Sequence, residues 1–280
     1  MKKRLVQIMD TTLRDGEQTS GVSFSAAEKL TIAQLLLQEV KVDRIEVASA
    51  RVSDGELQAV KNITSWAKEH DMLSRIEVLT FVDNGASIEW MLNAGAKVMN
   101  LLTKGSLNHL THQLKKTPQQ HFEDIKKTID QAINVGITVN VYLEDWSNGM
   151  KNSKDYVFQY LDFLTEEKGI CKILLPDTLG VLNPLETTAF LRETLLRYPN
   201  NHFEFHAHND YDLGTANVFA ALHEGIHGIH LTVNGLGERA GNAPLASAVA
   251  VIKDFMPEIE INIDEKALHT ISKFIETFSG

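Results

Sequence analysis

The chain has 280 residues, of which 43% are hydrophobic and 23% charged, and its formal net charge is −10 at pH 7. This length suits one large α/β domain, and the acidic balance argues against nucleic acid as a partner. The single cysteine, Cys171, excludes an internal disulfide and any cysteine-rich zinc module. No apolar run approaches the ~20 residues of a membrane span, and the basic start does not continue as a signal peptide, so we expect a cytoplasmic protein with no membrane partner.

Eight short, nearly continuous apolar runs rich in β-branched residues recur along the chain, each followed by a turn and a helical pattern. They are residues 5–9, 44–48, 76–81, 97–102, 138–143, 172–175, 202–205 and 228–233. Strands that alternate with helices predict βαβ units and parallel pairing, and their apolar continuity indicates burial on both faces. Eight units in about 250 residues predict an α/β fold of the (β/α)8 TIM-barrel class, as one domain over residues 1–280. A doubly wound open sheet is the alternative.

Several helix boundaries are readable in the sequence. Ser25 and Glu28 have the spacing of a capping box at the start of the first helix. Pro118 and Pro184 stand near the starts of two later helices, where a missing backbone amide costs little. The last helical pattern, at residues 265–278, is amphipathic, and its apolar side could either cover the barrel or meet a partner.

Two histidines and two polar residues far apart in the chain suggest a metal site. His206 and His208 stand at the end of the seventh run, where strand alternation places both imidazoles on one face, although such a pair also arises by chance. In a closed barrel, Asp15 after the first strand and Asn242 after the eighth lie beside them. This set suits Mg, Mn, Co or Zn, and leaves positions for the carboxylate and ketone oxygens of a 2-oxo acid.

Other polar residues are expected at the same rim. Arg14 adjoins the candidate aspartate ligand and keeps its charge, so it is suited to stabilise a developing alkoxide. Four more residues stand at or just past strand ends: Glu46, Tyr142, Glu144 and Thr178. A carboxylate in a closed cavity can act as a proton donor, but each of these residues could instead be tied to a neighbouring loop.

A glycine-rich segment, GLGERAG at residues 235–241, matches the dinucleotide-binding pattern between a strand and a helix. It lies in the last βα unit with no further unit after it, so we expect its glycines to bring the loop close to the metal and to present Asn242. The remaining histidines without comparable partners are interpreted as surface or helix-end residues: His109, His112, His121, His223, His227, His230 and His269.

Three long motifs, DTTLRDGEQ at residues 10–18, HAHND at 206–210 and NGLGERAGN at 234–242, carry a family resemblance. They resemble the metal-dependent acyltransferase and lyase barrels, which include isopropylmalate, homocitrate and citramalate synthases and HMG-CoA lyase. The chain looks most similar to citramalate synthases through residues 45–51, 100–105 and 140–146. The resemblance implies metal ligation by Asp15, His206 and His208 with Asn242 as a less uniform fourth ligand, and roles for Arg14, for Glu144 as proton donor and for Thr178 on the substrate carboxylate.

The reaction that the resemblance implies is a Claisen-type condensation of acetyl-CoA with a metal-bound 2-oxo acid, followed by hydrolysis that releases CoA. Leu79, Leu102 and Tyr142 would fill the space of a branched side chain, and isopropylmalate synthases carry a smaller residue where this chain has Tyr142. Pyruvate, giving citramalate for branched-chain amino acid (isoleucine) biosynthesis, is therefore favoured over 2-oxoisovalerate, giving 2-isopropylmalate for leucine. Such discrimination is worth only ~1–3 kcal/mol per methylene. Glu46 is grouped with the substrate-binding residues.

Two other functions are open, a lyase or aldolase that cleaves a 3-hydroxy acid, and a barrel that binds a 2-oxo acid without catalysis. The resembling synthases continue past the barrel into linker subdomains, which supply a histidine base near acetyl-CoA, and into a regulatory domain. This chain stops at Gly280. We therefore expect a catalytic domain without those parts, and the resemblance implies a homodimer in the full-length protein.

Overall fold

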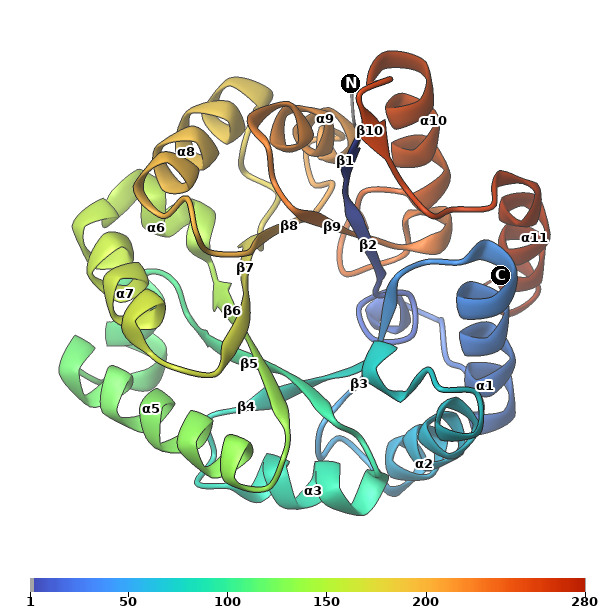
Figure 1. The fold of residues 1–280 in the computed structure, drawn as a ribbon, viewed down its shortest axis with the longest axis horizontal. Helices are drawn as coiled ribbons and strands as arrows, with labels where there is room; N and C mark the ends of the chain where they lie inside the picture. The colour runs from blue at the N-terminus through green and yellow to red at the C-terminus, as the bar shows by residue number, and fades with distance from the viewer. Residues whose placement is uncertain (1–2, 280) are drawn as a thin grey trace.

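A closed barrel of parallel strands forms the centre of the computed structural model, which describes residues 3–279 (Figure 1). The barrel strands are β2 (Gln7–Asp10), β3 (Arg44–Ser49), β4 (Ile76–Phe81), β5 (Val98–Lys104), β6 (Thr138–Glu144), β7 (Ile170–Asp177), β8 (Phe203–Ala207) and β9 (Gly228–Leu231). Each strand pairs with the next in chain order, and β9 closes the ring against β2. The predicted (β/α)8 barrel is therefore confirmed, and the open sheet is excluded.

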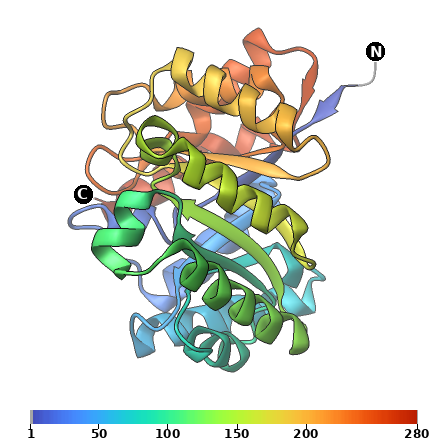
Figure 2. The ribbon, with the colours of Figure 1, turned by 90° about the vertical axis from the view of Figure 1, so that its left-hand side faces the viewer.

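Helices surround the barrel and cover the outer face of its strands (Figures 1 and 2). The longer helices are α1 (Ala26–Gln34) with its continuation η2 (Leu35–Val40), α2 (Asp54–Glu69), α3 (Ala86–Ala94), α5 (Pro118–Asn134), α7 (Lys154–Glu166), α8 (Pro184–Arg197), α9 (Gly214–Glu224), α10 (Leu245–Phe255) and α11 (Leu268–Ser279). The shorter ones are η1 (Gly16–Gln18), η3 (Leu73–Arg75), α4 (Leu107–His109), η4 (Leu110–Leu114), α6 (Trp146–Asn152), η5 (Val233–Gly235) and η6 (Glu265–Ala267). Within residues 3–279, no helix has the length and apolar character needed to cross a membrane.

The predicted helix boundaries agree with the structure. Ser25 caps α1, since its side chain accepts from the Glu28 amide while the Glu28 carboxylate accepts from the Ser25 amide. Pro118 and Pro184 both occupy the first turn of their helices, α5 and α8. A small sheet of β1 (Arg4–Leu5) and β10 (Ile259–Glu260) lies outside the barrel, just before β2 begins.

The amphipathic C-terminal helix α11 covers the barrel, which decides between its two predicted roles. Ile271 and Ile275 on this helix are fully buried in the main core. Phe278 packs edge-on against Phe24, with the ring centroids 6.3 Å apart. Figure 1 shows α11 beside α1.

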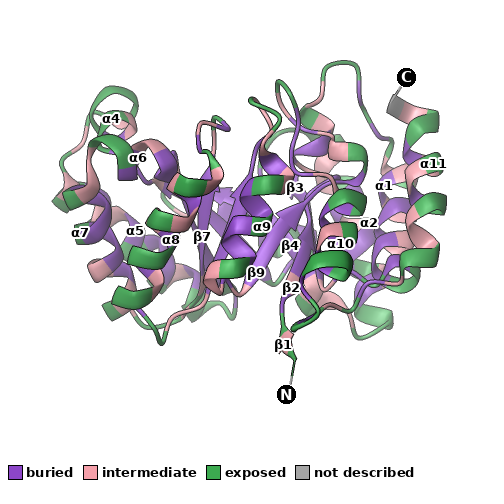
Figure 3. Ribbon diagram, turned by 90° about the horizontal axis from the view of Figure 1, so that it is seen from above, coloured by how far each residue is buried: buried purple, intermediate pink, exposed green. Residues whose placement is uncertain are grey.

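The barrel strands and the sides of the helices that face them are buried (Figure 3), and the side chains on the two sides of the barrel wall differ in character. The core between strands and helices is apolar and continuous. Inside the barrel, Arg44 of β3 bonds to Glu204 of β8, a strand that is not its neighbour, so this pair crosses the interior. Buried Asn100 and Asn140 bond to each other in the same space. Bulky branched side chains usually fill such an interior, whereas here the polar side chains share it with a small apolar cluster that includes Met9 and Leu174.

Candidate metal centre

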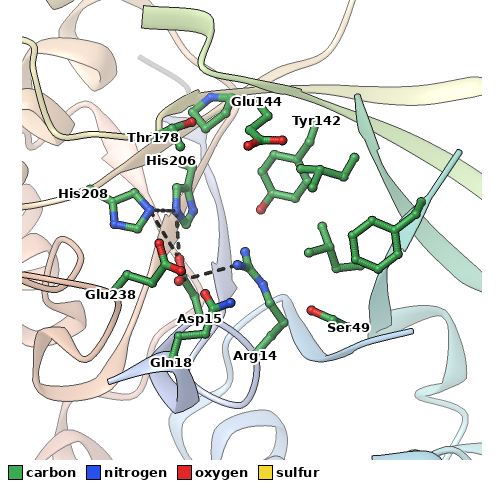
Figure 4. Close-up of a pocket in the computed structure, with 14 residues that line it drawn as sticks. Arg14, Asp15, Gln18, Ser49, Tyr142, Glu144, Thr178, His206, His208 and Glu238 are labelled. Atoms are coloured by element: carbon green, nitrogen blue, oxygen red, sulfur yellow. Dashed lines mark hydrogen bonds and ion pairs between the residues drawn. The ribbon is translucent and has the colours of Figure 1, made fainter. Parts of the chain in front are cut away.

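Asp15, His206 and His208 come together at the end of the barrel where the strands terminate (Figure 4). Asp15 follows β2, His206 lies in β8, and His208 follows β8. His206 Nε2 lies 3.1 Å from Asp15 Oδ2 and 3.2 Å from His208 Nε2, and His208 Nε2 lies 3.6 Å from Asp15 Oδ2. The three side chains are almost completely buried, with at most 6% exposed. The predicted convergence of these residues is confirmed.

The loop that carries Asp15 is held by hydrogen bonds within the first motif. The Asp15 amide donates to the Thr11 carbonyl at 2.8 Å, and Asp10 Oδ1 accepts from the Thr12 amide at 2.9 Å. The Thr12 hydroxyl accepts from the Val233 amide, which lies just after β9, at 2.8 Å. Aspartate and threonine shape turns in this way because their short side chains bond to nearby backbone groups. The motif therefore fixes Asp15 and joins the first loop of the barrel to the last.

The charge states of the three residues favour a cation between them. Burial lowers the pKa of His206 and of His208 to about 4, although Asp15 opposes this effect, so both imidazoles are neutral at pH 7. Burial alone would raise the pKa of Asp15, but Arg14 and His206 outweigh it and hold that pKa well below its ordinary value. Two neutral imidazole nitrogens and a carboxylate oxygen thus face one point, and this donor set fits a divalent metal ion.

Asn242 lies beside these three residues, with its side-chain nitrogen and not its oxygen toward Asp15. Its Nδ2 donates to Asp15 Oδ2 at 2.8 Å, while its buried Oδ1 has no hydrogen-bond partner among the described residues. Rotation of the amide exchanges these two atoms. Asn242 also forms a β-bridge with His208.

The glycine-rich loop makes this approach possible. A Cβ at Gly237 would lie 2.8 Å from Asn242 Oδ1, and Gly241 has a φ of +85°, in the left-handed region that favours glycine. The expectation that these glycines let the loop approach the candidate metal position while presenting Asn242 is confirmed.

Arg14 lies next to the candidate ligands and is held by a buried carboxylate. Its Nη1 is 3.5 Å from Asp15 Oδ1, and its Nε donates to Glu46 Oε2 at 2.5 Å. Burial opposes the positive charge, but Glu46 and Asp15 outweigh it and raise the pKa of Arg14 above its ordinary value. Asn100 Nδ2 donates to the other oxygen of Glu46 at 2.7 Å. The guanidinium is therefore both charged and fixed.

Glu46 does not line the cavity and contacts Arg14 instead, so the expected place at the rim is corrected. The prediction put Glu46 at the end of its strand, but β3 continues to Ser49. Three further strand residues place the Glu46 side chain below the rim, where it is fully buried. Burial also raises the pKa of Glu46, even though Arg14 lowers it.

A cavity of about 220 Å³ opens above the candidate ligands (Figure 4). The predicted site residues that line it are Arg14, Asp15, Leu79, Leu102, Tyr142, Glu144, Thr178, His206 and His208. Five other lining residues were not predicted: Gln18, Ser49, Phe81, Pro176 and Glu238. Gln18 and Glu238 belong to the long motifs, and the other three lie at or next to the ends of β3, β4 and β7. Membership of a long motif could have identified Gln18 and Glu238, and a position at a strand end could have identified the other three.

Glu144, the last residue of β6, and Thr178, the residue after β7, line the cavity. Thr178 Oγ1 accepts from the Asp145 amide at 2.8 Å, so its hydroxyl proton is free to bond to an acceptor in the cavity. Glu144 forms an ion pair with Lys104, and His109 Nδ1 lies 3.6 Å from its other oxygen. Both side chains are thus held from outside the cavity with polar atoms directed inward.

The interpretation of the remaining histidines is wrong for two of them. His230 is fully buried inside the barrel, where Nδ1 bonds to the Tyr142 hydroxyl at 2.8 Å and Nε2 to Glu204 at 2.9 Å. His121 is buried on α5 and accepts from the Lys104 amide at 3.1 Å. His230 alternates along β9 with the outward-facing Ile229 and Leu231 of the apolar core, and this period of two was the missed signal.

The fold and the site together define the class of the protein, a (β/α)8 barrel with a candidate Asp/His/His metal centre where its strands end. The sequence profile of the HMGL-like family matches residues 5–275, and the chain belongs to that family.

The chain is also similar to curated proteins and to solved structures. It is 34% identical over 271 residues to (R)-citramalate synthase of Methanocaldococcus jannaschii, covering 97% of this chain and 53% of that protein. It is 31% identical over 281 residues to 2-isopropylmalate synthase of Sulfurisphaera tokodaii, covering 100% and 70%. HMG-CoA lyase of Bacillus subtilis has the same fold, with a TM-score of 0.78 at 23% identity, covering 99% of this chain and 95% of that one. The chain thus spans about half to 70% of these synthases.

Proposed function

We propose that this protein catalyses a divalent-metal-dependent condensation of acetyl-CoA with a 2-oxo acid, most specifically pyruvate to give citramalate. The observation that carries the proposal is the arrangement of Arg14 beside the converging Asp15, His206 and His208 in one cavity. The similarity to citramalate and 2-isopropylmalate synthases supports the same reaction class.

We assign Asp15, His206, His208 and Asn242 to the metal, which is Mn, Mg, Co or Zn by the chemistry of its donors. When bound, such a cation supplies Lewis acidity toward the ketone of the 2-oxo acid. Arg14 is the group placed to donate hydrogen bonds to the ketone oxygen as it gains negative charge. Because its partners Glu46 and Asp15 already fix the guanidinium, little reorganisation is needed as that charge develops.

Two further residues have roles that their hydrogen bonds favour. Thr178 can donate its free hydroxyl proton to the substrate carboxylate, because the Asp145 amide occupies the other side of its oxygen. Glu144, held by Lys104, is placed to move a proton at the reacting end of acetyl-CoA. The acetyl methyl group gives a proton to a base that the longer enzyme would supply, and its carbon then bonds to the ketone carbon. The resulting alkoxide takes up a proton, for which Glu144 is the donor, and water cleaves the thioester to release CoA.

Pyruvate fits the cavity better than a branched 2-oxo acid. Leu79, Leu102 and Tyr142 line the cavity and pack together with Met9 and Leu174 inside the barrel. We expect these large side chains to accept the methyl group of pyruvate more readily than the isopropyl group of 2-oxoisovalerate. The alternative is a 2-isopropylmalate synthase that accepts 2-oxoisovalerate. It requires Leu79, Leu102 or Tyr142 to move and enlarge the cavity.

We also propose that these residues form the catalytic barrel of a longer enzyme that acts as a cytoplasmic homodimer. The two kinds of synthase relative support the longer enzyme, because both are longer than this chain, while the homodimer follows from the family resemblance alone. Sedimentation of the full-length protein at micromolar concentration tests the dimer, and a monomer there would contradict it.

Titration calorimetry with pyruvate and with 2-oxoisovalerate, each with and without Mn²⁺, tests the proposal. We expect Mn²⁺-dependent binding of pyruvate and binding of 2-oxoisovalerate weaker by about tenfold or more. Thiol release from acetyl-CoA by the full-length protein in the presence of pyruvate then separates a synthase from a barrel that only binds the acid. Cleavage of a 3-hydroxy acid without that release would indicate a lyase, and no binding of either acid would disprove the 2-oxo acid site.

A further inference from the structure

Tyr142, which forms part of the cavity wall, is the end of a chain of buried polar side chains that crosses the barrel. Its hydroxyl bonds to His230 Nδ1 at 2.8 Å, and His230 Nε2 bonds to Glu204 Oε2 at 2.9 Å. Arg44 Nη2 donates to both oxygens of Glu204 at 2.6 Å and Arg44 Nη1 to Glu77 Oε1 at 2.7 Å. The proposed reaction uses none of the residues behind Tyr142, so their arrangement needs another explanation.

The direction of every hydrogen bond in this chain is determined. Arg44 Nη2 donates to both oxygens of Glu204, the geometry in which a guanidinium binds an ionised carboxylate. The Glu204 carboxylate is therefore ionised and can only accept. His230 must then donate from Nε2, which leaves Nδ1 as an acceptor and makes the Tyr142 hydroxyl the donor. The hydroxyl proton is committed to His230, so Tyr142 acts toward a substrate as a fixed wall and not as an acid.

Two histidines that also contact each other pack against the ring of Tyr142. The ring stands edge-on to His206, at 6.0 Å between centroids and 89°, and edge-on to His230, at 5.6 Å and 85°. Glu204 itself fits only because residue 228 is glycine, since a Cβ there would lie 2.7 Å from the Glu204 Cδ. These residues are closely packed, so a movement of His230 or Glu204 would allow the Tyr142 side chain to change its position.

We propose that Arg44, Glu204 and His230 are positioning residues that fix Tyr142 and thereby limit the size of the 2-oxo acid side chain that the cavity accepts. The inference rests on the proposed function for its substrate, but the support of Tyr142 is a property of the barrel itself. Selectivity for pyruvate then depends on the hydrogen bond at the far end of the tyrosine as well as on the bulk of its ring.

Two substitutions of His230 separate this role from a general loss of packing. H230N places an amide oxygen near the position of Nδ1 and keeps the acceptor for Tyr142, whereas H230Q keeps the donor to Glu204 and loses that acceptor. By calorimetry with Mn²⁺, we expect H230Q to raise the affinity for 2-oxoisovalerate relative to pyruvate by about tenfold, the effect of roughly one methylene. H230N should stay within about twofold of the wild-type ratio, well inside that one-methylene effect.

Y142F and a remote variant complete the test. Y142F removes the donor, so we expect the same change in ratio as in H230Q and no further change in the double variant, because both break one bond. T64V removes a buried hydrogen bond from Thr64 to the Ala94 carbonyl between α2 and α3, and should lower stability without changing the ratio. A folded H230Q protein that keeps the wild-type ratio would overturn the proposal, as would additive effects in the double variant.

Crystal structures of the wild type, H230Q and H230N distinguish failure of this inference from failure of the proposed function. If the wild type binds neither acid, the proposed function fails. The position of the Tyr142 ring in the variants then shows by itself whether His230 holds the ring in place. A ring that turns away in H230Q but not in H230N sustains the positioning role. An unmoved ring in both variants refutes it.

Discussion

The barrel interior and the layer between strands and helices are both buried, yet they are built from different side chains. The outer layer is made of aliphatic and aromatic residues, such as Ile129 of α5 and Leu161 of α7. Their burial stabilises the fold through the hydrophobic effect, which is not directional. The interior holds ion pairs and hydrogen bonds, such as those of Arg44 and Glu204, which are directional and costly to bury. The comparison teaches that this protein separates the layer that stabilises the fold from the layer that orients the site.

The largest expected effect comes from breaking the interior network at Glu204. E204A leaves Arg44 buried without its main partner, and we expect the free energy of unfolding to fall by about 3–5 kcal/mol in urea denaturation. The matched control is E193Q, which breaks the exposed ion pair between Lys154 and Glu193 and should cost ~0–1 kcal/mol. Similar losses in the two variants would remove the distinction between interior and surface charge.

The pH dependence of stability tests the interior histidines. The pKa of His208 is lowered to about 4 in the folded, metal-free protein, so the unfolded chain, with a pKa near 6.5, binds more protons between these values. Stability is therefore fully present above about pH 6.5 and falls as the pH drops toward 4, by about 3 kcal/mol for this imidazole. H208Q should flatten the urea-unfolding profile between pH 4.5 and 7, and an unchanged slope would show that His208 is not buried in its neutral form.

Removal of one candidate ligand should abolish most of the metal affinity while leaving the outer layer intact. H206A is expected to weaken Mn²⁺ binding by about a hundredfold or more, since even supporting residues of metal sites contribute about 10–100-fold. H223A, which changes an exposed histidine of α9, is the control and should bind Mn²⁺ like the wild type. Calorimetry at pH 7 measures the Mn²⁺ affinity of both variants. An H206A affinity equal to that of the wild type would show that the metal binds elsewhere.

The smallest effect is expected in the outer layer. I129V removes one methyl group from a fully buried position of α5 and should cost about 0.5–1.5 kcal/mol in unfolding free energy. The preference between pyruvate and 2-oxoisovalerate should be unchanged, because this side chain does not reach the interior. A change in that preference would show that the two layers are coupled.

The sequence allowed the barrel and the rim of the site to be predicted because both follow from local patterns. Asp15, His206 and Asn242 stand in motifs at strand ends, and the ring of eight strands brings such ends together wherever they lie in the chain. The depth of Glu46 was not predictable in the same way, since it depends on where β3 ends. The contact between Tyr142 and His230 joins strands that are not neighbours, and the stagger of the whole barrel determines which interior residues meet.

The bond between Asn242 and Asp15 has a consequence for how the protein is made. These two residues are 227 positions apart, so Asp15 leaves the ribosome long before its partner exists. At about 5–20 residues per second, the interval is on the order of tens of seconds, during which the nascent chain lacks the donors of its last strands. His206, His208 and Asn242 all lie in the final third of the chain. Metal capture at this centre would therefore report that the strands of the barrel have all been synthesised and that β9 has closed against β2.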